Sequence, residues 1–127
     1  MISSASDGLS GLLQWSAPVI FDRLCVAYAG RLSESSASWR LARLHSRVWR
    51  ALISGEMENF DRLRSELVGE LTAVGLSLDD LAEADAQTMS ELLEIVIARF
   101  RRSPRLSHGY HLALIQLASR LAPAEAA

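Results

Sequence analysis

The feature that most constrains the fold is the recurrence of apolar residues every three or four positions along most of the chain. The clearest such stripe consists of Met57, Phe60, Leu63, Leu67, Leu71 and Val74. This spacing places the side chains on one face of an α-helix. Only three prolines and seven glycines are available to interrupt helices, and no segment has the turn chemistry of a β-hairpin. The sequence therefore predicts an all-α protein.

The periodicity and its interruptions predict about six helices. The expected segments are 7–14, 17–32, 37–54, 56–74, 78–102 and 105–121. Pro18 follows a candidate N-cap, Ser16, which indicates a helix start there. Gly55 and Gly75 are suited to end helices. A short turn around Pro104 implies that the last two helices form an antiparallel pair.

The length of 127 residues fits one domain. We expect a single helical domain over 1–127, with 1–15 and 122–127 as its mobile ends. No run of 18 apolar residues is present, and the start has no basic segment before its apolar patch. A membrane span and a secretory signal are therefore not expected. The expected location is the cytoplasm.

The net charge is −2, and all thirteen cations are arginines. An acidic middle, 56–94, separates two basic ends, so pairing of basic with acidic helices is the expected use of these charges. Arg40, Arg43, Arg47 and Arg50, with Trp39 and Trp49 nearby, could instead contact phosphates and bases. The negative net charge argues against that alternative. We expect no nucleic-acid partner.

Three histidines are the residues that could carry chemistry. His108 and His111 are spaced i, i+3 on one predicted helix, as a metal site can require, but no third ligand is evident nearby. His45 has no Ser or Cys nucleophile placed relative to it. A single cysteine, Cys25, excludes a zinc site built from several cysteines. We therefore expect no enzymatic activity, catalytic residue, metal or cofactor, and an enzyme using these histidines is the weakest alternative.

Three short motifs in the middle of the chain resemble the bacterial globin-coupled sensors. Ser54-Gly55 is similar to the family's Leu-Phe-Ser-Gly helix end. Residues 68–72, Val-Gly-Glu-Leu-Thr, are similar to its Ile-Gly-x-x-His pattern, with a one-residue gap. Val-Gly-Leu at 74–76 is similar to its closing Ile-Gly-Leu. The resemblance covers about residues 39–102. It implies a globin-like fold or a related orthogonal helical bundle.

One departure from the family pattern changes what the resemblance implies. The histidine that carries haem in the family falls at or beside Thr72, and threonine cannot serve as the proximal ligand. The resemblance therefore implies a non-haem sensor domain, a kind of module that acts in signalling. The last two helices of such sensors form a dimer interface, which implies a homodimer. The signal would pass to a partner protein.

The leading hypothesis is thus a non-enzymatic, dimeric helical sensor or regulatory module. A pocket for a small apolar ligand is expected between segments 37–54, 56–74 and 78–102. Its predicted walls are Leu44, Val48, Leu67, Leu71 and Met89. The predicted dimer interface comprises Leu92, Val96, Arg99, Tyr110, Leu114 and Leu117. The alternative, which the uneven charge supports equally, is a structural or adaptor subunit of a larger assembly without a pocket.

The absence of the haem histidine gives a first test. When the purified protein is titrated with haemin, absorption spectroscopy should show no sharp, saturable one-to-one Soret shift, because Thr72 offers no axial ligand. A saturable shift that is lost in His45→Ala or His111→Ala would contradict this prediction and indicate a haem sensor with an unusual ligand.

Overall fold

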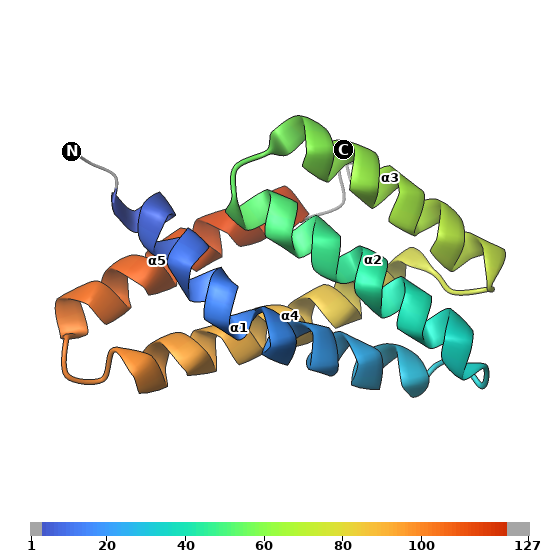
Figure 1. Ribbon diagram of the computed structural model, residues 1–127, viewed down its shortest axis with the longest axis horizontal. Coiled ribbons are helices and arrows are strands. Elements are labelled where there is room, and N and C mark those ends of the chain that lie inside the picture. Colours follow the sequence, from blue (N-terminus) through green and yellow to red (C-terminus); the bar gives the residue numbers. More distant parts are fainter. Residues whose placement is uncertain (1–3, 122–127) are drawn as a thin grey trace.

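The computed structural model describes residues 4–121, with side chains from residue 17 onward. Figure 1 shows that this part of the chain is all-helical and contains no strand. Its five helices are α1 (Ser4–Ala29), α2 (Ser35–Ile53), α3 (Met57–Ala73), α4 (Leu78–Arg99) and α5 (Pro104–Leu121). The all-α prediction is confirmed at this level, whereas the expected count of six helices is not.

The difference in helix count arises in α1. The predicted segments 7–14 and 17–32 are one continuous helix, so Ser16 lies inside it rather than at its start. Pro18 is also internal. A proline removes one backbone hydrogen bond and bends a helix without necessarily ending it. Accordingly, α1 changes direction partway along its length in Figure 1.

The predicted mobile ends fall partly outside the described residues. Residues 1–3 and 122–127 are not described, while residues 4–15 form the first turns of α1. None of the helices within 4–121 has a long enough apolar stretch to cross a lipid bilayer.

Helix α2 is central to the packing, because it lies against both α1 and α3. It contributes Leu41, Trp49 and Leu52 to the core, each almost fully buried. The predicted stripe on α3 faces the same core, with Phe60 and Leu71 among its buried members. Burial of such side chains supplies most of the stabilising free energy of a helical domain, at about 25 cal/mol for each Å² of apolar surface.

Helices α4 and α5 form the other part of the fold. α4 packs against α1 and α5, and α5 runs back along α4 in the opposite direction (Figure 1). Close to the turn between them, the rings of Phe100 and Tyr110 are stacked with centroids 4.7 Å apart.

Backbone geometry explains where several helices begin and end. Gly55 and Gly75, which follow α2 and α3, have φ of 78° and 86°. Glycine adopts this left-handed conformation without the steric cost that other residues meet. At the start of α4, the Ser77 hydroxyl accepts a hydrogen bond from the Asp80 backbone N–H (3.3 Å). The Ser77 backbone N–H in turn donates to the Asp80 carboxylate (2.9 Å), which completes a capping box.

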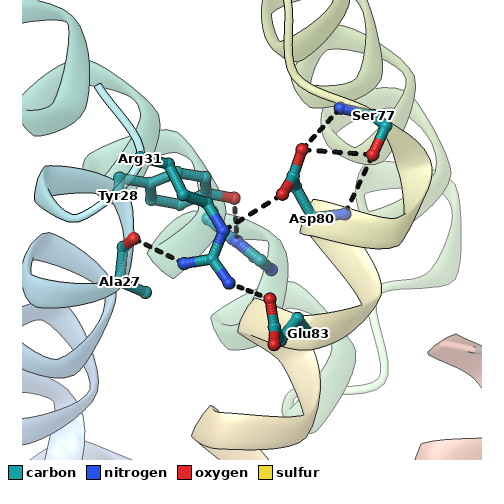
Figure 2. A network of polar contacts seen from close by, with 7 residues as sticks. Ala27, Tyr28, Arg31, Ser77, Asp80 and Glu83 are labelled. Atoms are coloured by element: carbon teal, nitrogen blue, oxygen red, sulfur yellow. Dashed lines mark hydrogen bonds and ion pairs between the residues drawn. The ribbon is translucent and has the colours of Figure 1, made fainter. Parts of the chain in front are cut away.

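An arginine joins this helix start to the end of α1, as Figure 2 shows. Arg31 donates from Nε to Asp80 Oδ1 (3.1 Å), and a terminal nitrogen pairs with Glu83. Another terminal nitrogen donates to the carbonyl oxygen of Ala27 at 2.7 Å. The hydrogen bond from the Ser77 backbone, reinforced by Arg31, holds the pKa of Asp80 below its ordinary value. We call Arg31, Asp80 and Glu83 the arginine clamp.

The capping box predicts the effect of a single substitution. Ser77→Ala should lower the free energy of unfolding by about 1 kcal/mol, because the first turn of α4 loses a hydrogen-bond acceptor. Urea denaturation followed by circular dichroism measures this change. The control, Ser65→Ala at an exposed position of α3, should change the free energy by less than about 0.5 kcal/mol. Equal effects of the two substitutions would show that the cap does not stabilise α4.

Candidate functional site

A histidine and an aspartate lie inside the apolar core. His45 of α2 has 0% of its surface exposed, and Asp85 of α4 has 7%. Burial of such groups is costly unless each polar atom finds a partner. Among the described residues, no buried side-chain nitrogen or oxygen is without a hydrogen-bond partner.

Three hydrogen bonds connect these residues across three helices. Tyr28 Oη lies 2.7 Å from His45 Nδ1, and His45 Nε2 lies 2.6 Å from Asp85 Oδ1. Trp49 Nε1 donates to the same Asp85 oxygen at 3.0 Å. Tyr28 comes from α1, His45 and Trp49 from α2, and Asp85 from α4. We call these four residues the core polar network.

The contacts pair both ring nitrogens of His45 within the core polar network. Nδ1 forms a hydrogen bond with the Tyr28 hydroxyl, and Nε2 forms one with the Asp85 carboxylate. In this arrangement every donor has an acceptor. Burial, followed by the nearby charge of Asp85, raises the pKa of Tyr28 well above its ordinary value of 10.0. The phenol therefore keeps its proton.

The order of these groups superficially resembles a catalytic relay, in which an acid orients a histidine base that activates a hydroxyl. The lack of solvent access to the Tyr28 hydroxyl and the His45 ring argues against that chemistry. Tyr28 and His45 both have 0% of their surface exposed, so a substrate could not reach the hydroxyl that a base would activate. The raised pKa of Tyr28 also disfavours a nucleophilic phenolate. The core polar network is therefore suited to positioning helices rather than to catalysis.

Asp85 also contributes to a pocket, which gives the core polar network a route to the surface. The pocket has a volume of about 440 Å³ and lies between α4 and the end of α5. The residues that line it are Ala82, Asp85, Ala86, Met89, Ser90, Leu93, Ala118 and Leu121. Its volume is within the range of small-molecule sites. We call it the α4–α5 pocket.

The structure separates the residues predicted to line a ligand pocket. Leu44, Val48, Leu67 and Leu71 are buried members of the hydrophobic core. Met89 is half-buried and lines the α4–α5 pocket instead. Of the five predicted wall residues, only Met89 lines the α4–α5 pocket.

The residues predicted to form a dimer interface also divide into two groups. Leu92, Val96 and Leu114 are fully buried within the core of the single chain. Tyr110 and Leu117 are half-buried, and Arg99 is exposed. An interface at these positions stays a prediction.

Of the remaining candidate residues, only Trp49 belongs to the core polar network. His108 and His111 border a hollow beside the turn between α4 and α5. Within the described residues, no group of three potential ligands could hold a metal ion. On α2, Arg43 lies over the exposed ring of Trp39, 5.4 Å from its centroid. Trp49 is in the core instead, which corrects its placement beside the arginine stripe as a ring available for stacking on a base.

The sequence indicates His45 as a candidate but not the partners that explain its position. Leu41, His45 and Trp49 follow one another at steps of four. All three therefore share one face of α2. That spacing could have indicated an inward-facing histidine. No sequence signal identifies Asp85 as its partner, because Asp85 is 40 positions away.

No family model, curated protein or solved structure matches the chain. The resemblance to sensor globins accordingly stays a prediction that rests on its three motifs. Thr72, at the position of the family's haem ligand, is exposed on α3, and its hydroxyl donates to the Val68 carbonyl oxygen at 2.9 Å.

The raised pKa of Tyr28 predicts how stability depends on pH. The folded chain retains a proton that the unfolded chain releases above pH 10.0, so the free energy of unfolding should fall as the pH rises beyond that value. One such proton gives a slope of at most about 1.4 kcal/mol for each pH unit. Urea denaturation between neutral and alkaline pH measures the slope.

Matched variants separate Tyr28 from other alkaline groups, including Cys25, whose pKa is also raised, mainly by burial. Tyr28→Phe should reduce the alkaline slope and cost about 1–3 kcal/mol at neutral pH, because His45 Nδ1 loses its hydrogen-bond partner. Tyr110→Phe should leave the slope in place. A slope that persists unchanged in Tyr28→Phe would disprove the assignment.

Proposed function

We propose that this protein is a non-enzymatic helical sensor or regulatory module that passes a signal to a partner protein. One observation carries the proposal: Asp85 belongs both to the core polar network and to the wall of the α4–α5 pocket. A molecule in the pocket would lie beside the group that links α4 to α1 and α2. If it bound one helix arrangement more tightly than another, it would shift the protein toward that arrangement.

The inaccessibility of Tyr28 and His45 supports the non-enzymatic part of this proposal. The sensor-globin relationship and the globin-like arrangement rest on the three sequence motifs. Under this proposal the module uses no haem, because Thr72 replaces the histidine. A cytoplasmic location and a bacterial source also belong to the proposal.

Exposed apolar side chains support a homodimer built on the C-terminal helices. They are Ile97 on α4 and Leu106, Leu112 and Ile115 on α5. Leu112 and Ile115 are one helical turn apart and therefore neighbours on the surface of α5. A two-fold dimer could pair this patch with the same patch of a second copy.

A structural or adaptor subunit is the second candidate function. The observation that favours it is apolar exposure away from the C-terminal pair. Val26 on α1 is 63% exposed and Trp39 on α2 is 47% exposed. Additional protein partners could cover these side chains within a larger assembly.

Light scattering coupled to gel filtration tests the dimer. The chain should elute with the mass of a dimer at high concentration. The double variant Leu112→Asp/Ile115→Asp should be monomeric, because charged groups cannot be buried without partners at an interface. The matched control Val26→Asp, at an exposed position of α1 rather than α5, should remain dimeric. A monomeric wild-type protein at high concentration, or a monomeric control, would exclude dimerisation through α5.

A further inference from the structure

Asp85 brings a largely buried carboxyl group to one end of the α4–α5 pocket. Its contacts with His45 Nε2 and Trp49 Nε1 both reach the same oxygen, Oδ1. Neither of these two contacts involves Oδ2, the second oxygen of this pocket-lining side chain.

Two arginines, Arg31 and Arg64, make their contacts with groups other than Asp85. Arg31 pairs with Asp80 and Glu83 in the arginine clamp. Arg64 of α3 donates to the backbone carbonyl oxygens of Arg120 and Leu121 at the end of α5. The second of these contacts fixes Leu121, a wall residue, without bringing the guanidinium into the set that lines the α4–α5 pocket.

The rest of the pocket wall is mostly apolar. Ala82, Ala86, Met89 and Leu93 follow one another at steps of four, three and four, which places them on one face of α4. Ala118 and Leu121 of α5 form the opposite side, and Ser90 supplies a hydroxyl. The alanine side chains leave room between the helices, and the flexible thioether of Met89 can adapt to an occupant.

The geometry points to the α4–α5 pocket as a binding site for a small organic cation with an apolar body, such as an arylalkyl or alkyl ammonium ion. The ammonium group would pair with the Asp85 carboxylate, while the apolar body would lie against Met89 and Leu93. A charge-assisted hydrogen bond in a partly dry site is stronger than one in water. This inference deepens the proposed sensor function and rests on it, because it names the chemical class that the module would sense.

Nuclear magnetic resonance titration of the full chain tests the ligand class. Three probes of similar size are added to the nitrogen-15-labelled protein at neutral pH and low salt: 2-phenylethylammonium, 3-phenylpropan-1-ol and 3-phenylpropanoate. The ammonium ion should give saturable amide shifts concentrated in 82–93 and 118–121. Its dissociation constant should be at least about tenfold below those of the alcohol and the carboxylate.

Two pairs of variants, each with its own control, locate the site. Asp85→Asn keeps an oxygen that can accept from His45 and Trp49 but removes the charge, so it should weaken binding by at least about tenfold. Asp79→Asn makes the same change at an exposed position of α4 and should bind as the wild type does. Should Asp85→Asn fail to fold, Ala86→Leu, which fills the pocket from its exposed wall, should abolish binding. Its control, Ala98→Leu at another exposed position of α4, should not.

Other outcomes would overturn the inference. Equal affinities for the ammonium ion and the alcohol would show an apolar groove without selectivity for charge. No saturable shift, or shifts outside the pocket, would remove the site. Light scattering with and without the ammonium ion separates this inference from the function on which it rests. Local binding without any change in oligomeric state or helix packing would sustain the site and count against a sensor.

Discussion

The hydrogen bond between His45 Nε2 and Asp85 Oδ1 is the contact on which the rest of the structure depends. α4 packs closely against α1 and α5, whereas α2 and α4 are not among the closely packed helix pairs. Long side chains span the space between these two helices, and the core polar network is their direct polar link. Tyr28 adds α1 to the same connection. The two parts of the fold are thereby held together by oriented bonds as well as by apolar packing.

The core polar network restricts the movement of helices more than apolar packing does. Apolar contacts tolerate sliding of one helix along another, because they have little directional preference. The core polar network does not, since a shift of α2 along α4 would leave the buried Trp49 N–H or the His45 ring without a partner. The buried carboxylate is stable because its neighbours are aligned donors. The same carboxyl group distinguishes its end of the α4–α5 pocket from the mostly apolar remainder of the wall.

Local periodicity predicted the parts of the fold that depend on neighbouring residues. The stripe from Met57 to Val74 indicated α3 and its buried face, and Gly55 and Gly75 marked the ends of two helices. The start of α1 was mispredicted because Pro18 was interpreted as a boundary, whereas the helix continues through it. The partners of His45 could not be predicted, because contacts between residues 40 positions apart depend on how the helices pack. For the same reason, periodicity alone could not distinguish Met89 beside a pocket from Leu67 in a packed core.

Asp80 has two roles at the start of α4, since one carboxylate both completes the capping box and receives Arg31. Fraying of the first turn of α4 would therefore also release the end of α1, and detachment of Arg31 would weaken the cap. The two segments are far apart in sequence, yet the carboxylate that they share would make them open together. Their backbone amides would then exchange with solvent as a single unit. The rate of that opening would govern how often the helix that carries Asp85 is loosened at its N-terminal end.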